Sequence, residues 1–203
     1  MTNGAVAAVL LVAAAAAGTP AAAAEPIVGG PCEGCELVFA GMPETLTSEA
    51  RIAPADEPGE PLTIEGVVTH RDGRPAEGIV VYAYHTDASG IYPDGDTRHG
   101  RLRGWALTDR DGRYRFETIR PAAYPGRTVP QHVHMHVVEP GYATYWIDSI
   151  VFSDDPLLSE ADRRDARDGR GGSGLVEPVE DGSGGWTVRR DIVLGLGVPG
   201  YGT

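Results

Sequence analysis

The sequence contains no lysine, because all 17 of its basic residues are arginine. This absence excludes chemistry that depends on a lysine amine, such as Schiff-base formation, pyridoxal phosphate catalysis and phosphate binding by a Walker-type loop. Positive charge is also in the minority, since 29 acidic residues leave a formal net charge of −12. A chain of this charge repels the phosphates of nucleic acid, so we expect no nucleic-acid partner.

Charged side chains are absent from the first 24 residues, and an apolar run fills residues 5–18. This run is shorter than the roughly 20 residues that span a bilayer, and the small residues Ala22 and Ala24 suit cleavage by signal peptidase. We therefore predict a signal peptide over residues 1–24, export to the periplasm or secretion, and no stable membrane insertion after cleavage. The alternative is an anchor that stays in the membrane.

Cysteine is scarce, and its two copies, Cys32 and Cys35, form a Cys-x-x-Cys motif. In an exported protein this pair predicts a small disulfide. A redox or metal role is the alternative, but two cysteines supply half of a structural zinc site, and no β-α-β pattern surrounds them. Residues 25–60 are rich in Pro, Glu and Gly and predict an extended N-terminal arm that carries the Cys pair. This arm either braces a homodimer or folds back on its own chain.

Long helical patterns are also missing, and from about Pro61 onward short alternating or β-branched runs are separated by turn dipeptides. These runs cover residues 62–70, 79–86, 102–108, 114–119, 132–138, 147–152 and 186–194. The pattern predicts an all-β fold, a β-sandwich of about seven to nine strands over residues 61–203. Asp111-Gly112 predicts a hairpin between the third and fourth runs, and residues 159–167 predict one short charged helix.

Histidine is concentrated in one of these runs, at His132, His134 and His136. Alternate residues of a strand point to the same face, so the three imidazoles share one face. Burying three imidazoles without partners costs several kcal/mol. They therefore need a metal ion, carboxylates or water, and the His-x-His spacing favours a metal ion.

Several motifs fall in a fixed order around these histidines over about residues 62–156. They are YHTDASGIY (84–92), RGW (103–105), TDRDGRYRFETIRP (108–121), YP (124–125) and PQHVH (130–134). Their order and spacing resemble those of the intradiol ring-cleavage dioxygenases, the superfamily of catechol and protocatechuate 3,4-dioxygenases.

This resemblance implies a transthyretin-like β-sandwich with a non-haem Fe(III) site. The implied iron ligands are Tyr92, Tyr124, His132 and His134, and the implied substrates are O₂ and a small catecholic aromatic, cleaved to a muconate-type product. Tyr124 is the implied catalytic residue, because in the family the second, axial tyrosinate leaves the metal and helps to deprotonate the catechol. The donor set is chemically sensible, since phenolate oxygens suit a hard ferric ion and balance its charge.

The sequence departs from the family pattern at several positions of the expected substrate pocket. Val129 stands where the active family usually has an arginine, Ser149 where a glutamine is expected, and Tyr84 where a tryptophan is common. Removal of a charge-stabilising group lowers rates by orders of magnitude. The arginines that are candidates to replace the missing charge are Arg103, Arg120 and Arg127.

His136 is an addition to the family pattern. It is either a residue outside the metal shell or a further ligand or acid–base group.

Two other functions are compatible with the same residues. One is a non-catalytic β-sandwich that binds a metal or a ligand, which predicts no oxygen uptake with any catechol. The other keeps catalysis but uses another metal such as copper, with the three histidines as ligands. The acidic charge and the lack of an identified carboxylate-binding arginine disfavour anionic substrates such as protocatechuate.

Overall fold

The structure is a computed structural model that describes Met1, residues 26–32 and residues 34–202. Residues 2–24 of the predicted signal peptide lie outside the described residues. The longer strands are β2 (Pro61–Thr69), β3 (Val80–Tyr84), β4 (Arg103–Leu107), β5 (Arg113–Ile119), β6 (His132–Glu139), β7 (Ala143–Phe152) and β10 (Trp186–Arg189). The shorter elements are η1 (Cys35–Leu37), β1 (Glu49–Arg51), α1 (Glu160–Arg167), β8 (Leu175–Val176), β9 (Val179–Glu180) and β11 (Ile192–Val193).

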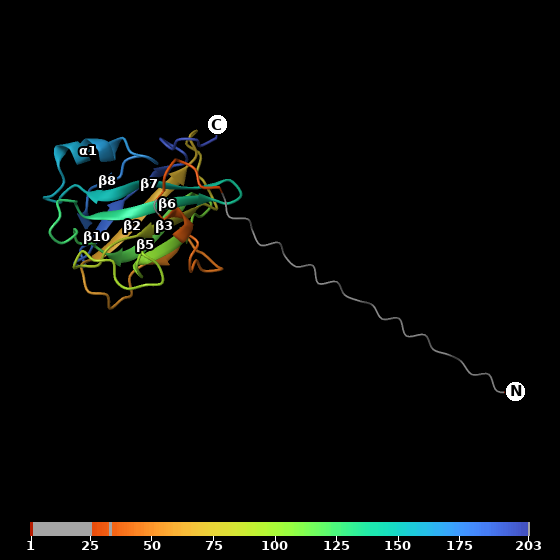
Figure 1. The fold of residues 1–203 in the computed structure, drawn as a ribbon, viewed down its shortest axis with the longest axis horizontal. Helices are drawn as coiled ribbons and strands as arrows, with labels where there is room; N and C mark the ends of the chain where they lie inside the picture. The colour runs from red at the N-terminus through yellow and green to blue at the C-terminus, as the bar shows by residue number, and fades with distance from the viewer. Residues whose placement is uncertain (2–25, 33, 203) are drawn as a thin grey trace.

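Two sheets face each other and form a β-sandwich (Figure 1). One sheet has the order β1-β5-β2-β10-β9, and β11 also pairs with β2. The other has the order β4-β3-β6-β7-β8. The predicted all-β sandwich is therefore confirmed.

The seven strands of four or more residues coincide with the seven runs identified in the sequence. Of the four shorter strands, β11 lies within the last run, 186–194, whereas β1, β8 and β9 are two or three residues long, which is too short to give a pattern. Helix α1 also forms as expected, and Ser159 caps it in a reciprocal capping box with Asp162. Within residues 26–32 and 34–202, no helix combines the length and apolar character needed to cross a bilayer.

The predicted hairpin at Asp111-Gly112 is wrong in one respect. The turn forms, and the Asp109 carboxylate accepts hydrogen bonds from the backbone N–H groups of Asp111 and Arg113. However, β4 pairs with β3 and β5 pairs with β2, so the turn connects the two sheets. The reason is that each strand has its own buried face, with Ala106 on β4 and Phe116 on β5 both contributing to the core between the sheets.

Strand β6 shows how the site is separated from this core. Val133, Met135 and Val137 point inward and are almost fully buried between the sheets. Because side chains alternate along a strand, the three histidines of β6 lie on the opposite, outer face of the five-stranded sheet. The expected shared face is therefore present, and the core keeps its apolar character.

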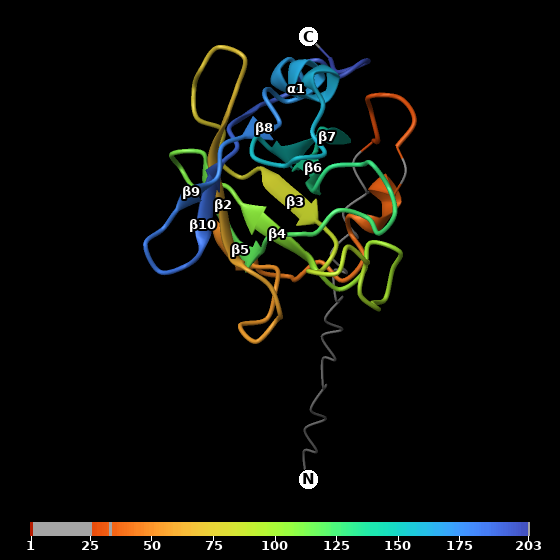
Figure 2. The same cartoon turned by 90° about the vertical axis from the view of Figure 1, so that its left-hand side faces the viewer.

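The N-terminal arm covers part of this outer face. Val38 packs in a small apolar cluster with Tyr82, Tyr84 and Val138, and Phe39 lies against the same cluster. The indole N–H of Trp105 on β4 donates a hydrogen bond to the carbonyl oxygen of Val38, at 2.6 Å. Figure 2 shows the arm, in orange, on the side of the five-stranded sheet that faces away from β2 and β10. The histidine face of β6 thus lies beneath the arm.

Candidate metal centre

A cavity of about 490 Å³ lies at the outer face of the five-stranded sheet, next to the arm. Its walls come from the arm, from the loop after β3, from the loop after β5, and from strands β6 and β7. The lining residues are Pro31, Cys32, Tyr84, Tyr92, Arg98, His99, Tyr124, His134, Met135, His136, Trp146, Ile147, Asp148 and Ser149. A cavity of this size is typical of small-molecule sites.

Three of the four residues predicted as metal ligands, Tyr92, Tyr124 and His134, line this cavity, and His132 lies next to Tyr124 and His134. The hydroxyl oxygens of Tyr92 and Tyr124 are 2.8 Å apart, and the Tyr124 oxygen is 3.2 Å from Nε2 of His132. The rings of His132 and His134 meet edge to face, with centroids 4.7 Å apart. Residues that are separated by up to 42 positions in the sequence therefore present two phenol oxygens and two imidazoles to one region.

Hydrogen bonds fix how the two imidazoles are presented. Nδ1 of His132 lies 2.8 Å from the carbonyl oxygen of Pro130, and a carbonyl only accepts, so Nδ1 carries the proton. This leaves the lone pair on Nε2 facing Tyr124. Nδ1 of His134 contacts the hydroxyl of Ser149 at 3.3 Å. Such contacts to the second ring nitrogen are the usual way in which metal-ligating histidines are oriented.

Burial controls the protonation of the group. It lowers the pKa of His132, and together with the neighbouring histidines it lowers the pKa of His134 to about 3. Both imidazoles are therefore neutral at neutral pH, which is the form that ligates a metal. Burial, together with the hydrogen bond to Tyr124, raises the pKa of Tyr92. A bound cation reverses this preference, since it stabilises the phenolate.

The donor set fits a ferric ion. Two donors that bind one metal at about 2 Å and roughly at right angles lie about 3 Å apart, close to the separations of 2.8 and 3.2 Å along Tyr92, Tyr124 and His132. Hard phenolate oxygens and borderline imidazole nitrogens are a combination suited to iron.

The expected pocket residues divide into two groups. Tyr84, Ser149 and His136 line the cavity, whereas Val129 and Arg103 are not among its lining residues. Val129 is 41% exposed, on a loop. The Arg103 guanidinium donates a hydrogen bond to the hydroxyl of Thr97 and lies over the Trp105 ring, which directs it elsewhere. For these two residues the structure corrects the expectation.

The cation that reaches the cavity is Arg98, which the sequence did not single out. Arg120 forms a two-pronged ion pair with Asp154, and Arg127 is exposed. Arg98 and its neighbour His99 lie in an irregular loop, so no periodicity marked them. The sequence signal that could have identified them as cavity residues is their position only a few residues after Tyr92.

Cys32 of the Cys-x-x-Cys motif also belongs to the cavity wall. Cys32 and Cys35 are joined by a disulfide, with Cα atoms 5.7 Å apart. The indole N–H of Trp146 on β7 donates a hydrogen bond to the carbonyl oxygen of Pro31, which ties the start of this motif to the sheet.

Fold and site together define a β-sandwich with a histidine–tyrosine cavity on one outer sheet face. The dioxygenase family model matches residues 38–171, about two thirds of the chain. The chain belongs to this family, and its relatives identify the branch as the intradiol ring-cleavage dioxygenases.

Two curated relatives illustrate the likeness. Catechol 1,2-dioxygenase 1 of Acinetobacter lwoffii is 34% identical over 106 residues, which cover 44% of this chain and 34% of the relative. The protocatechuate 3,4-dioxygenase beta chain of Burkholderia cepacia is 29% identical and covers 50% of this chain and 48% of the relative. The chain thus spans about a third to a half of the length of these relatives.

Among solved structures, the chain resembles the dioxygenase domain of a dioxygenase–carbohydrate-binding fusion protein from Streptomyces sp. SirexAA-E. The TM-score is 0.57 at 25% identity, and the match covers 78% of this chain and 96% of that domain.

Proposed function

We propose that this chain is a non-haem Fe(III) intradiol dioxygenase that inserts O₂ into a small catecholic ring. The observation that carries the proposal is the convergence of Tyr92, Tyr124, His132 and the adjacent His134, of which all but His132 line one cavity. Ring cleavage by this route consumes one O₂ per catechol, breaks the bond between the two hydroxyl-bearing carbons, and places both oxygen atoms in the two carboxyl groups of a cis,cis-muconate.

Each of the four residues has a distinct task in this proposal. His132 and His134, held by Pro130 and Ser149, supply the neutral nitrogens, and Tyr92 supplies a buried phenolate oxygen. When bound, Fe(III) supplies the Lewis acidity and the electron-accepting capacity that activate a catecholate toward O₂. Tyr124 lies next to the exposed loop 125–129, and its oxygen accepts a catechol proton when the substrate enters.

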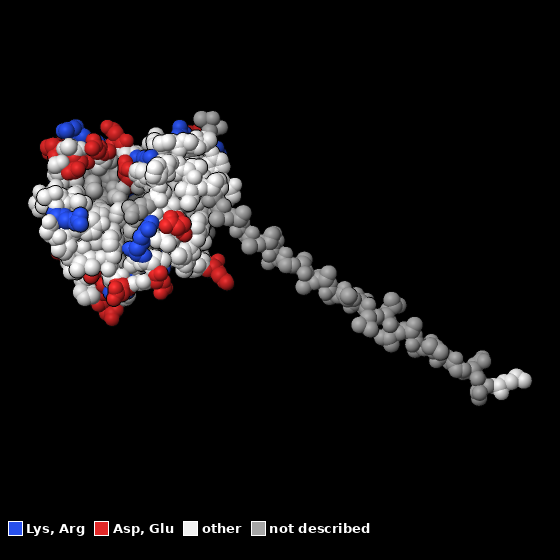
Figure 3. All heavy atoms as spheres, in the orientation of Figure 1, with Lys and Arg blue, Asp and Glu red and all other residues white. Residues whose placement is uncertain are grey.

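The cavity suggests a substrate with a single aromatic ring. Tyr84 and Trp146 provide aromatic walls. Arg98 is the cation in the lining, placed to compensate for negative charge on a bound catecholate. The net charge of −12 works against substrates that carry a carboxylate. In Figure 3, acidic side chains are spread around the visible face, and both signs occur over α1.

The proposal includes the cellular location suggested by the sequence. Residues 1–24 act as a signal peptide, and the mature protein is exported to the periplasm or secreted. Mass measurement of the N-terminus of the mature protein, isolated separately from cells and from culture medium, tests this part.

The catalytic proposal is tested on the purified chain. We expect bound iron, a broad visible absorption from tyrosinate-to-iron charge transfer, oxygen uptake with part of a catechol panel, and a muconate product. Tyr92→Phe should lose the colour and the activity. Tyr142→Phe is the matched control, because Tyr142 is exposed and its hydroxyl bonds to the carbonyl of Gly202.

Other outcomes would contradict the proposal in distinguishable ways. A colourless, iron-free protein that consumes no oxygen indicates the non-catalytic binding module. Copper in place of iron, with oxygen uptake retained, indicates the other oxidative reaction.

A further inference from the structure

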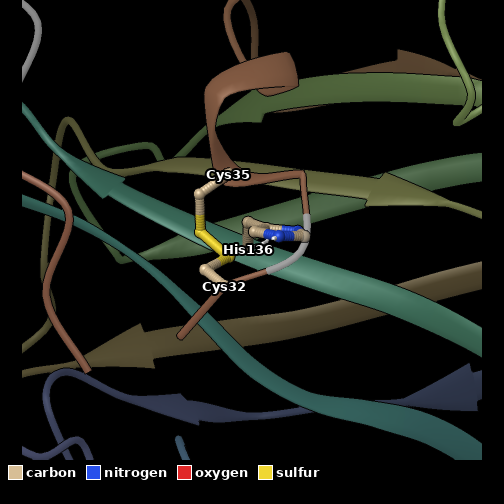
Figure 4. A group of neighbouring side chains, drawn as sticks. All are labelled: Cys32, Cys35 and His136. Carbon is tan, nitrogen blue, oxygen red and sulfur yellow. Dashed lines mark hydrogen bonds between the residues drawn. A yellow bond between two sulfur atoms is a disulfide. The ribbon is translucent and has the colours of Figure 1, made fainter. Parts of the chain in front are cut away.

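The Cys-x-x-Cys motif of the arm lies against His136 on β6, as Figure 4 shows. Sγ of Cys32 is 3.6 Å from Nε2 of His136. The potential ligand atoms of Cys32, Cys35 and His136 all lie within 4.8 Å of one another. Three residues from two segments, separated by about a hundred positions in the sequence, therefore form one compact sulfur–nitrogen cluster.

The dioxygenase chemistry leaves this cluster without a task. His136 is the histidine that the family pattern does not contain, and it is only 3% exposed. Among the described residues its Nδ1 has no hydrogen-bond partner, and its Nε2 contacts Sγ of Cys32. A neutral imidazole has one donor and one acceptor, so burying it without partners costs roughly 1–3 kcal/mol. Some other interaction is needed to explain a histidine at this position.

A second unsatisfied nitrogen lies beside the same loop. His99 is 2% exposed, and its Nδ1 is 2.8 Å from the Tyr82 hydroxyl, but its Nε2 has no partner in the described part of the chain. This nitrogen faces Gly34, the residue before Cys35, where a Cβ atom would come within 2.2 Å of it. Gly34 has a φ of 96°, a conformation that glycine adopts readily. The loop is thus shaped to bring two imidazoles close to the cysteines.

The separation of Cys32 and His136 matches a tetrahedral metal site. With metal–sulfur bonds of about 2.3 Å and metal–nitrogen bonds of about 2.0–2.1 Å, a sulfur and a nitrogen on one ion lie about 3.6 Å apart. This is the separation of Cys32 Sγ and His136 Nε2. Formation of the site requires the two sulfurs, which are bonded in the disulfide, to separate to roughly 3.8 Å. It also requires Sγ of Cys35, which lies within 4.8 Å of Nε2 of His136, to come to about 3.6 Å from that nitrogen.

We propose that Cys32, Cys35 and His136 form a second metal site, for a zinc-class ion, when the disulfide is reduced. Its fourth position faces the cavity, because Cys32 and His136 both contribute to the cavity lining. Thiolates select soft or borderline ions, which separates this site chemically from the tyrosine–histidine site and its hard ferric ion.

The oxidation state of the cysteines controls the occupancy of this site. A reductant such as a water-soluble phosphine cleaves the S–S bond and is converted to the phosphine oxide with oxygen from water, leaving two thiols. Zn²⁺ then binds, and the two thiols release two protons to solvent. Reoxidation by any two-electron oxidant restores the disulfide and releases the ion.

The test compares the same purified chain in its oxidised and its phosphine-reduced forms. After incubation with Zn²⁺ and removal of free metal, we expect about one additional zinc ion per reduced chain. The zinc content of the oxidised chain gives the amount of zinc that the tyrosine–histidine site holds. Co²⁺ in place of Zn²⁺ should give thiolate-to-cobalt charge-transfer absorption in the reduced form alone, and Zn²⁺ should protect both thiols from a thiol reagent.

Variants identify the ligands. Cys32→Ser should remove the additional zinc and the cobalt absorption, and His136→Gln should weaken zinc binding by at least about tenfold. His70→Gln is the matched control, because His70 lies in a turn outside the cavity. Circular dichroism establishes that each variant is folded. Equal zinc in the oxidised and the reduced wild-type chain would overturn the proposal, and this comparison needs no variant.

This inference does not depend on the proposed dioxygenase activity. Tyr92→Phe should abolish the iron colour and leave the reduction-dependent zinc binding unchanged. Cys32→Ser should abolish the reduction-dependent zinc binding and leave the iron colour unchanged. A chain that takes up no iron but binds zinc after reduction would refute the first proposal and support the second.

Discussion

The ring of Tyr84 is stacked on the imidazole of His134, with centroids 4.6 Å apart and planes inclined by 21°. The two residues pair directly across β3 and β6, so the sheet register sets the stack. Tyr84 also stacks on His99, with centroids 3.8 Å apart. One aromatic ring therefore contacts a proposed iron ligand and the histidine beside the Cys-x-x-Cys loop.

Removal of the Tyr84 ring should leave the imidazole of His134 less firmly oriented for metal binding. We expect Tyr84→Ala to weaken iron binding by about 10–100-fold, the range seen when groups that orient metal ligands are lost. Tyr84→Phe keeps the ring and should stay within a few-fold of the wild type. Iron affinity measured by competition with a chelator tests this, and similar losses in the two variants would show that the stack does not orient the ligand.

Ser149 should act through His134 in the same way. Its hydroxyl contacts Nδ1 of His134 at 3.3 Å, so Ser149→Ala leaves that nitrogen without this partner. We expect iron binding and activity to fall by about 10–100-fold, with a shift of the visible absorption band. Ser173→Ala is the control, since Ser173 is exposed and its hydroxyl bonds to the carbonyl of Leu175. An unchanged spectrum and iron affinity in Ser149→Ala would contradict this role.

Arg98 should support turnover and contribute little to folding. Its ion pair with Glu36 is largely exposed, and such pairs contribute at most about 1 kcal/mol. We expect Arg98→Gln to lower kcat/KM for catechols by about tenfold or more, because the cavity loses the cation that offsets charge on the substrate. Arg127→Gln, on the exposed loop, should leave kcat/KM unchanged. Equal effects of the two substitutions would indicate only a general loss of positive charge.

His85 should make folding sensitive to acid. It is fully buried, its Nδ1 donates to the carbonyl oxygen of Thr86, and its Nε2 lies 2.7 Å from the Thr118 hydroxyl. Burial lowers the pKa of His85 from 6.5 to about 4, although the Thr86 carbonyl opposes this shift. Between these pH values the unfolded chain binds a proton that the folded chain excludes. The stability is therefore fully present above pH 6.5 and falls as the pH decreases toward 4, by roughly 3 kcal/mol in total.

Urea unfolding of the iron-free protein at several pH values between 7 and 4 measures this loss. His85→Gln cannot take up the proton, so the free energy of unfolding of this variant should depend less steeply on pH than that of the wild type. Parallel pH profiles for the two proteins would show that His85 is not the group responsible.

The sequence was sufficient to predict the strands because each long strand carries its own signal. The alternation in β6 assigns valine and methionine to one face and histidine to the other, and the structure follows this assignment over residues 132–137. The family motifs likewise identified Tyr92 and Tyr124, which no periodicity marks. Local signals were enough to predict the long strands, and motif order was enough to propose the candidate ligands.

The remaining features depend on contacts that no local pattern encodes. The register of β3 against β6 places Tyr84 beside His134, and the path of the arm brings Cys32 to His136. After the Asp111-Gly112 turn the chain enters the other sheet, because β4 pairs with β3 and β5 pairs with β2. Arg98 reaches the cavity through an irregular loop, and Arg103 is turned away by Thr97 and Trp105. Each of these outcomes is decided by packing between distant segments.

Strand β6 has a consequence for how this protein can change. Residues that hold the two sheets together and residues that offer nitrogen ligands alternate one by one over residues 132–137 of this strand. Substitution at His132, His134 or His136 therefore replaces a chemical group without removing a side chain from the apolar interior. The same sandwich can in this way carry other ligand sets, so metal preference and reaction can diverge while the fold stays as it is.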